Sequence, residues 1–514
     1  MYKMVTLWQF NYFGKVKGFF MKKMFVGSAL LLAAVSIVVA VSNVQAAEGK
    51  KAKNLILMIG DGMGVNSDVA GTYYRFGEKQ AQQYHKFRFL TSATFSLKAA
   101  DFDEDTETGY DGDFFWGGLD KAHGINDRTG TTDSAASGTA LNWGHKTHNG
   151  RIGSDFDGKR VELLGDLAEK AGKSVGAVSS VQIANATPAA VKAHQFTRSL
   201  LKEISREQIL DQQGLTVLMG AGHPEFNNGE KVTDALDYSN VGGQVIWEAL
   251  RADNGFAGVK FIEKKSDFDA LAAATPDKAG RKLPKRLVGV VQAVEDMAPV
   301  DGYPDGDPKN ANFLETVGPN VDAKIASIPT LSQMAVGALN ILSANENGFY
   351  LMVEGGAIDH ANHANNINLS VLEHTSFTKA VDSVIAWVET YSSWDETLLI
   401  ITADHETGQL WGEGTYDDAN NNNTPDEGET FNGYKNVKNN GKGNVPGAQY
   451  ATNDHTNATV PFWIHGAGAE CVDQFIRGKD PQAAKFYGAD GYQYDGSYIY
   501  NSDVPKIFKA ASCL

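Results

Sequence analysis

The chain has 514 residues, which is enough for a large core and more than one minimal domain needs. Its formal net charge is −16, and residues 1–46 contribute five lysines and no acid, so the remainder carries −21. Nucleic-acid-binding proteins present a basic patch. The charge therefore argues against that class and fits a soluble exported protein.

The N-terminal residues predict an export signal. Met21-Lys22-Lys23 forms a basic start, residues 25–41 are apolar, and Val44-Gln45-Ala46 resembles a cleavage site. Residues 1–20 look like an upstream extension, because Met21 opens a complete signal by itself. An uncleaved membrane anchor is the alternative, which the cleavage motif disfavours. We expect an exported protein, periplasmic or extracellular, with no stable membrane anchor and with a single domain over residues 47–514.

Buried strands and amphipathic helices alternate along the rest of the chain. Short apolar runs predict strands at Asn54–Ile59, Val175–Val181, Thr216–Met219, Leu287–Val291, Phe349–Val353, Leu398–Thr402 and Val460–Ile464. Helical patterns cover Val161–Ala171, Leu331–Leu342 and Leu369–Val388, and Thr330 with Gln333 forms a capping box. This alternation predicts an α/β fold of three layers, α/β/α, with a central, largely parallel sheet.

Two stretches do not follow this alternation of strands and helices. Residues 101–120 are acidic and rich in glycine and aromatic residues, and residues 412–450 are dominated by Asn, Gly and Asp. Both are predicted to be surface insertions.

Polar groups follow several of the predicted strands. Asp61 follows the first, Asn185 and Thr187 follow the second, and Asp404-His405-Glu406 follows Leu398–Thr402. Ligands of such sheets bind beyond the carboxyl ends of the strands. The sequence therefore predicts a site at this edge.

The segment Val353–His363 is the most informative of these strand ends. Asp359 and His363 are four residues apart, so on a helix they share one face. A carboxylate and an imidazole that converge there are typical zinc ligands. Ser134 lies in a run of small residues that opens a helix; alone, this run is more typical of a helix cap than of a phosphate site.

Taken together, these motifs resemble the alkaline phosphatase family, in its bacterial secreted branch with large insertions. The segments that carry the resemblance occur in the family's order from Asp61 to His455. They are Gly60–Gly64, Thr132–Ser137, Ala186–Ala189, Val353–Gly356 with Ile358–His360 and His363, Thr402–Gly408, and Asp454–Thr456.

The resemblance implies a phosphomonoesterase that hydrolyses small phosphate monoesters through a phosphoserine intermediate on Ser134, with Arg198 gripping the phosphate. It also implies two Zn²⁺ ions and one Mg²⁺ ion per chain. The ligands implied are Asp359, His363 and His455 for the first zinc, Asp61, Asp404 and His405 for the second, and Asp61, Thr187 and Glu354 for the third ion. These residue types suit the respective metals. A homodimer is expected by analogy.

The sequence departs from the family pattern around the third ion. Asn185 stands where the family usually has Asp or His, and His360 stands beside Asp359. We expect both near the third ion or the phosphate without direct ligation. A neutral Asn185 leaves the identity and affinity of the third ion open.

Two further features are independent of the reaction. Oxygen-bearing side chains at Asp418, Asn420, Asn422, Asp426 and Glu429 imitate a twelve-residue calcium loop, although a disordered polar loop is the alternative. Cys471 and Cys513 could form one disulfide after export, and two free thiols are the alternative.

Two other functions compete with the phosphomonoesterase. One is a phosphodiesterase or nucleotide pyrophosphatase on a related metal frame, against which Arg198 and the third-ion residues argue. The other is a non-catalytic, metal-stabilised surface protein, against which the complete ligand set argues.

Overall fold

The computed structural model describes residues 50–98, 109–121, 129–210, 215–252, 256, 258–276, 283–303, 321–420, 422, 429–489, 491–512 and 514. The predicted export signal lies outside these residues. The described residues all belong to the unit Gly49–Leu514.

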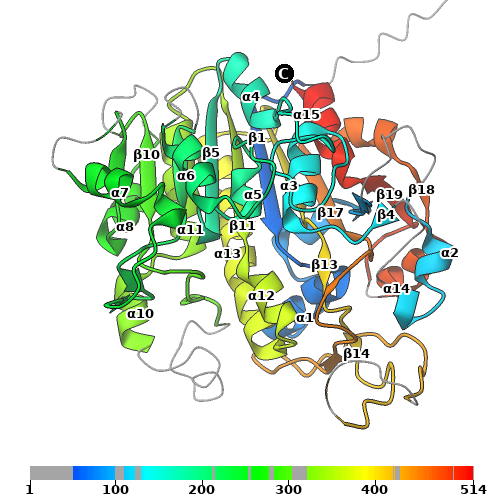
Figure 1. Cartoon of the computed structure of the whole chain (residues 1–514). Helices are drawn as coiled ribbons and strands as arrows, with labels where there is room; N and C mark the ends of the chain where they lie inside the picture. Colours follow the sequence, from blue (N-terminus) through cyan, green and yellow to red (C-terminus); the bar gives the residue numbers. More distant parts are fainter. Residues whose placement is uncertain are drawn as a thin grey trace, which may run out of the picture. The chain divides into compact units, whose positions relative to one another are not determined.

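A mixed sheet of eleven strands runs through this unit (Figure 1). In spatial order the strands are β18 (Gly478–Lys479), β19 (Ser497–Tyr500), β2 (Arg88–Ala93), β17 (Val460–Gly466), β12 (Thr397–Thr402), β1 (Asn54–Gly60), β11 (Phe349–Gly355), β5 (Ser174–Gln182), β6 (Val217–Ala221), β10 (Leu287–Val290) and β9 (Lys260–Ile262). The seven strands from β12 to β9 are mutually parallel, whereas β17 is antiparallel to both its neighbours. The predicted α/β architecture with a largely parallel sheet is confirmed.

Helices cover both faces of this sheet. The helices within the described residues are α1 (Val65–Phe76), α2 (Gly112–Phe115), α3 (Ser134–Trp143), α4 (Leu164–Lys170), α5 (Ala186–Ala189), α6 (Leu201–Leu210), α7 (Gln244–Arg251), α8 (Lys265–Ala273), α10 (Val321–Ser327), α11 (Leu331–Leu342), α12 (Ala357–His363), α13 (Ile367–Tyr391), α14 (Pro481–Ala489) and α15 (Val504–Ala511). Four two-stranded ladders lie outside the sheet: β3 (Ser96–Leu97) with β4 (Thr129–Gly130), β7 (Phe226–Asn227) with β8 (Glu230–Lys231), β13 (Glu406–Thr407) with β16 (His455–Thr456), and β14 (Trp411–Gly412) with β15 (Ala448–Gln449).

The central strands are apolar throughout because both of their faces are buried. In β1, Leu55 and Leu57 belong to the core cluster that includes residues of α4, α7 and α15. Ile56 and Met58 alternate with them and belong to the opposite cluster, with residues of α1, α11 and α13. Successive side chains of a strand point to opposite faces. A continuous apolar run is therefore what a strand between two helical layers requires.

The predicted capping box is present at the start of α11. The Thr330 hydroxyl accepts from the Gln333 backbone N–H at 3.1 Å, and the Gln333 side chain accepts from the Thr330 N–H at 2.8 Å. By length and composition alone, Lys324–Leu342 is apolar enough to cross a membrane. Its apolar side chains Leu331, Met334 and Leu339 are buried in the core, which accounts for their hydropathy without a membrane.

The described part of the predicted insertion 101–120 contributes to a buried aromatic cluster. Phe115 is buried, and the Trp116 ring stacks on Phe486 with centroids 5.2 Å apart. Tyr434, in the second predicted insertion, contacts Trp116 edge-on at 5.2 Å. The two stretches therefore pack near one another, while Phe114 and Phe431 within them are exposed.

Candidate active site

The predicted polar groups meet at the C-terminal ends of the three central strands β1, β11 and β12. Ile59 of β1 is in register with Glu354 of β11 and with Thr402 of β12. Asp61 follows β1 directly, and Asp404 lies two residues beyond β12. In Figure 1, α12 follows β11 at this end of the sheet. Because the three strands are parallel and in register, the carboxylates that follow them lie close together at the same end of the sheet.

Gly62 allows these segments to approach closely. Its φ is +67°, in the left-handed region, and a Cβ there would lie 2.7 Å from both Cα and Oδ1 of Asp359. A side chain at this position would separate Asp61 from the α12 residues. The glycine beside the first carboxylate is thus required by the geometry of the site.

Asp359, His363 and His455 form a first cluster of metal-ligating side chains. Asp359 and His363 share one face of α12, with His363 Nε2 3.3 Å from Asp359 Oδ2. His455 joins them because β16 pairs with β13, and its Nε2 lies 2.9 Å from Nε2 of His363. The Nδ1 atom of His363 donates to the Asn453 carbonyl at 2.6 Å, and that of His455 to the Thr132 carbonyl at 2.8 Å. In the neutral rings, both Nε2 lone pairs then face each other, an arrangement that a cation between them would stabilise.

Asp61, Asp404 and His405 form a second, more deeply buried cluster. His405 Nε2 lies 3.4 Å from Asp61 Oδ1 and 3.2 Å from Asp404 Oδ2. Thr407 connects this cluster to the first: its hydroxyl donates to Asp359 Oδ1 at 2.5 Å and lies 3.2 Å from His405 Nδ1. Since the Thr407 hydrogen is used on Asp359, His405 Nδ1–H must be the donor to Thr407. The lone pair of Nε2 is thereby directed at the cluster.

Ser134 begins α3 and points at the second cluster. Its Oγ lies 3.2 Å from His405 Nε2. Asp133 caps the helix by accepting from the Ala136 N–H at 2.9 Å. The serine is 3% exposed, so it is buried at the floor of the site.

Glu354, Thr187 and Asp61 supply the oxygen atoms expected around a third ion. Glu354 Oε2 accepts from the Ser179 hydroxyl at 2.5 Å. Four buried oxygen atoms of the site have no hydrogen-bond partner among the described residues: Asp61 Oδ1, Thr187 Oγ1, Glu354 Oε1 and Asp404 Oδ2. Buried polar atoms are nearly always satisfied in native proteins. These orphaned oxygens fit metal ions at the predicted positions.

The electrostatics of the second cluster also favour a cation. Burial and the neighbouring carboxylates Asp404, Asp359 and Glu354 raise the pKa of Asp61 well above its usual range. Burial, Asp359 and Glu354 likewise raise the pKa of Asp404 to about 8. Burial lowers the pKa of His405 well below its usual value, so its ring is neutral. Several buried carboxylates around the neutral His405 ring make a site that favours cations.

Arg198 lines the mouth of the same cavity, which has a volume of about 580 Å³. Its Nη1 lies 3.2 Å from Asp133 Oδ2, and its Nη2 donates to Asn185 Oδ1 at 3.2 Å. Asp133 therefore holds the arginine with one oxygen and caps α3 with the other. Sequence reasoning assigned no such role to Asp133, although an Asp directly before a helix-opening Ser is a recognisable cap signal.

Asn185 and His360, both expected near the third ion or the phosphate, have different partners. The Asn185 side chain contacts Arg198 and the Ala186 N–H. His360 lines the cavity, and its Nδ1 lies 2.8 Å from Asp296 Oδ1. Asp296 lies beyond β10, in a loop without a motif, so no local signal in the sequence could have identified it.

The calcium-loop and disulfide predictions fall partly outside the described residues. Asp426 and Cys513 are both outside them, so neither prediction is tested in full. The Asn422 N–H donates to Asp418 Oδ1 at 3.0 Å and to Asn420 Oδ1 at 3.1 Å, and Glu429 accepts from the Ala419 N–H at 2.8 Å. Within the described residues, Cys471 is a free thiol.

Comparison with known proteins places this geometry in a family. The alkaline phosphatase family model matches residues 52–500. Alkaline phosphatase H of Pseudomonas aeruginosa is 31% identical over 382 residues, covering 70% of this chain and 71% of that protein. The alkaline phosphatase of Escherichia coli K12 is 29% identical over 391 residues, covering 69% and 70%. The crystal structure of Thermus thermophilus alkaline phosphatase has a TM-score of 0.57 at 19% identity, covering 91% and 92%, and supports the fold.

Proposed function

The chain belongs to the alkaline phosphatase family, and we propose that it is a metal-dependent phosphomonoesterase that works through a phosphoserine intermediate on Ser134. Family membership supports phosphomonoesterase activity. The observation that carries the finer proposal is the position of Ser134, whose Oγ is 3.2 Å from His405 Nε2 and which shares one cavity with Arg198 and the first cluster.

Two zinc ions and one magnesium ion are the metals that these residues suit. Asp359, His363 and His455 would hold the first zinc, and Asp61, Asp404 and His405 the second, since both sets offer imidazole nitrogen and carboxylate oxygen. The oxygens of Asp61, Thr187 and Glu354 suit magnesium. When bound, the zinc pair would supply positive charge that activates the serine hydroxyl and stabilises the attacking and leaving oxygens.

The protein's own residues account for the remaining steps. Arg198, held by Asp133 and Asn185, would bind two phosphate oxygens through its planar fork of donors. Ser134 Oγ would attack phosphorus as the bond from phosphorus to the alcohol oxygen breaks, giving phosphoserine and the free alcohol. Water would then attack phosphorus, returning the proton to Ser134 and releasing inorganic phosphate.

The test compares p-nitrophenyl phosphate with bis(p-nitrophenyl) phosphate after measurement of bound metal. We expect rapid hydrolysis of the monoester only, with about two equivalents of zinc and one of magnesium per chain on the family's stoichiometry. Ser134→Ala should lower kcat by at least about 1,000-fold while the protein stays folded. Undiminished turnover by that variant would rule out the covalent route, and preference for the diester would favour the phosphodiesterase alternative.

Export and self-association are part of the same proposal. The segment Met21–Ala46 supports export to the periplasm or the medium. A homodimer is proposed by analogy with the family, and sedimentation of the purified mature protein would test it.

A further inference from the structure

The segment that carries Arg198 connects α5 with α6, and its backbone is held by a neighbouring loop. Gln195 and Ile152 exchange both backbone hydrogen bonds, at 2.9 and 3.0 Å. The Arg198 N–H donates to the Gly150 carbonyl at 2.7 Å. The backbone of the arginine is therefore fixed to this loop at two points three residues apart.

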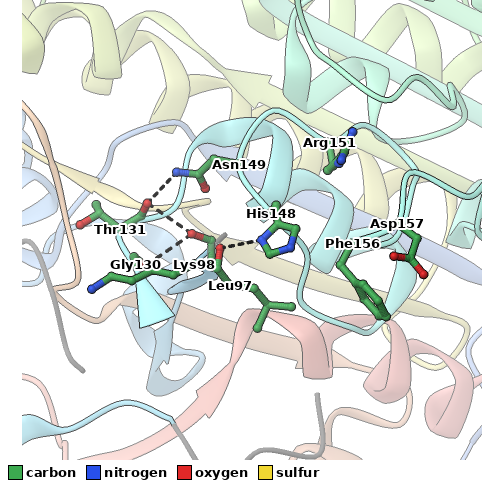
Figure 2. A pocket seen from close by; sticks show the side chains of 10 residues that line it. Leu97, Lys98, Gly130, Thr131, His148, Asn149, Arg151, Phe156 and Asp157 are labelled. Carbon is green, nitrogen blue, oxygen red and sulfur yellow. Dashed lines mark hydrogen bonds between the residues drawn. The ribbon is translucent and has the colours of Figure 1, made fainter. Parts of the chain in front are cut away.

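The same loop is bound to the residue that caps α3. The Gly150 N–H donates to Asp133 Oδ2 at 3.0 Å, and the Asp133 N–H donates to Asn149 Oδ1 at 3.1 Å. Figure 2 shows both neighbours of this glycine, Asn149 and Arg151. Arg151 Nη1 donates to the Phe196 carbonyl at 2.7 Å. The loop thus joins the start of the helix that carries the nucleophile to the segment that carries Arg198.

Glu207 of α6 holds this segment from its other side. Its Oε2 accepts from the His194 backbone N–H at 3.0 Å and from Gln195 Nε2 at 3.1 Å, and its Oε1 lies 3.2 Å from His194 Nδ1. Burial alone would raise the pKa of Glu207, but the hydrogen bonds from His194 and the charge of Arg160 lower it, so the acceptor is a carboxylate. Hydrogen bonds to charged acceptors are stronger than those between neutral groups. Glu207 is therefore a strong anchor of the segment on α6.

Charged groups from three parts of the chain face the His194 ring. They are Asp166 of α4, Glu207 of α6 and Arg160 of the chain before α4, and the nearby Lys192 pairs with Asp166 and Glu169. Although burial alone would lower it, hydrogen bonds to Asp166 and Glu207 raise the pKa of His194 to about 9. The ring is therefore protonated at neutral pH and loses its proton in the alkaline range.

The proton on His194 decides what its Nδ1 atom can bind. In the charged ring both nitrogens donate, Nε2 to the Val161 carbonyl at 2.9 Å and Nδ1 to Glu207 Oε1 at 3.2 Å. The neutral ring keeps its hydrogen on Nε2, because the Val161 carbonyl needs a donor and Arg160 Nη2, at 3.0 Å, can donate to Nδ1. Loss of the proton therefore removes one bond between α6 and the segment that carries Arg198.

We propose that Glu207 and protonated His194 are positioning residues that hold Arg198 in the orientation in which it binds phosphate. The proposal rests on the proposed function for the role of Arg198. The Arg198 side chain is 36% exposed, and a long exposed side chain loses binding strength when it samples several orientations. Glu207 and His194 act through the arginine and do not touch the substrate. Phosphate binding therefore weakens when either contact is lost.

The experiment is a calorimetric titration of inorganic phosphate into Ser134→Ala protein reconstituted with zinc and magnesium. Adding Glu207→Gln should weaken phosphate binding about three- to tenfold, less than the roughly 100-fold that a 1 Å misplacement can cost. Glu169→Gln is the matched control, because Glu169 belongs to the same charged group but pairs with Lys192. No loss in Glu207→Gln, or an equal loss in the control, would overturn the proposal. If Glu207→Gln does not fold, Gln195→Met decides, and an unchanged affinity in that variant would overturn it.

Two further comparisons separate positioning from a merely structural role. In an Arg198→Ala background, Glu207→Gln should cause no further loss of phosphate affinity, because it acts through the arginine. The ratio of phosphate affinities with and without Arg198→Ala should fall as the pH rises through about 9, where His194 loses its proton. The same ratio measured in His194→Gln should stay constant over this range. Additive losses, or an equal fall of the ratio in both proteins, would contradict the proposal.

Hydrolysis of p-nitrophenyl phosphate separates this proposal from the proposed function. If phosphate binds with the dependence on Glu207 described above but the monoester is not hydrolysed, the proposed function fails and the positioning role stands. If the monoester is hydrolysed and Glu207→Gln changes neither phosphate affinity nor kcat/KM, the positioning role fails alone.

Discussion

Replacing Thr407 by valine should weaken zinc binding without unfolding the protein. The Thr407 hydroxyl donates to Asp359 Oδ1 at 2.5 Å and accepts from His405 Nδ1 at 3.2 Å. It is buried and holds one predicted ligand of each zinc. Valine has nearly the same shape, so the change removes the hydroxyl and little else.

The size of the effect follows from the two hydrogen bonds. One is made to a carboxylate, and the loss of the other leaves the His405 N–H buried without an acceptor, which costs about 1–3 kcal/mol. Removing a residue that orients a ligand typically lowers metal affinity about 10- to 100-fold. That range corresponds to ~1.4 to 2.8 kcal/mol, so the two estimates agree.

Competition against a chelator of known zinc affinity measures the change. Thr375→Val is the matched control, because Thr375 is also buried and donates to the Val371 carbonyl at 2.7 Å within α13. We expect a loss of zinc affinity in Thr407→Val alone, with kcat recovered to within about twofold in excess zinc. Zinc affinity equal to that of the control would refute the role of Thr407 in orienting the ligands.

Three other predictions concern separate parts of the molecule. Although burial alone would lower it, hydrogen bonds to Asp166 and Glu207 raise the pKa of His194 to about 9. Protonated His194 therefore stabilises the fold fully below pH ~6.5, and this stabilisation is lost as the pH rises through 9. The melting temperature of His194→Gln should not show this part of the decrease with pH. Asp296→Ala and His360→Ala should each lower kcat/KM several-fold, and the double variant should lose no more than either single variant because the two side chains contact each other; additive losses would exclude joint action. If the loop at Asp418 binds calcium, adding calcium after EDTA treatment and reconstitution with zinc and magnesium should raise the melting temperature; an unchanged melting temperature would exclude that site.

The central strands could be predicted from the sequence because burial of both faces requires apolar side chains at consecutive positions. Phe349–Val353 and Leu398–Thr402 are uninterrupted apolar runs, and both lie within observed strands of nearly the same bounds. The edge strands left no such signal. β18 is two residues long, and β9 is three residues long and begins with an exposed lysine, so neither has the apolar run of a central strand.

The convergence of the ligands could be predicted, but the contacts that orient them could not. Asp359 and His363 are brought together by helical spacing, which the sequence displays. Asp296 and His360 are 64 residues apart and meet only because a loop beyond β10 folds back over α12. Thr407 follows His405 in the sequence, yet its contact with Asp359 depends on tertiary structure. Such partners are defined by distance in space, and a single sequence contains no record of that distance.

The position of the site also carries an energetic consequence. Asp61, Glu354 and Asp404 come from three adjacent strands, and each is almost completely buried. Burying one unpaired carboxylate costs several kcal/mol, and mutual repulsion adds to that cost. Arg198 lies at the mouth of the cavity and is held by Asp133, so it does not neutralise this set. On the proposed metal content, cations offset the repulsion, and metal binding and the stability of this edge of the sheet are coupled. The residues that would bring a phosphate ester to the nucleophile therefore also make the metal-free fold less stable.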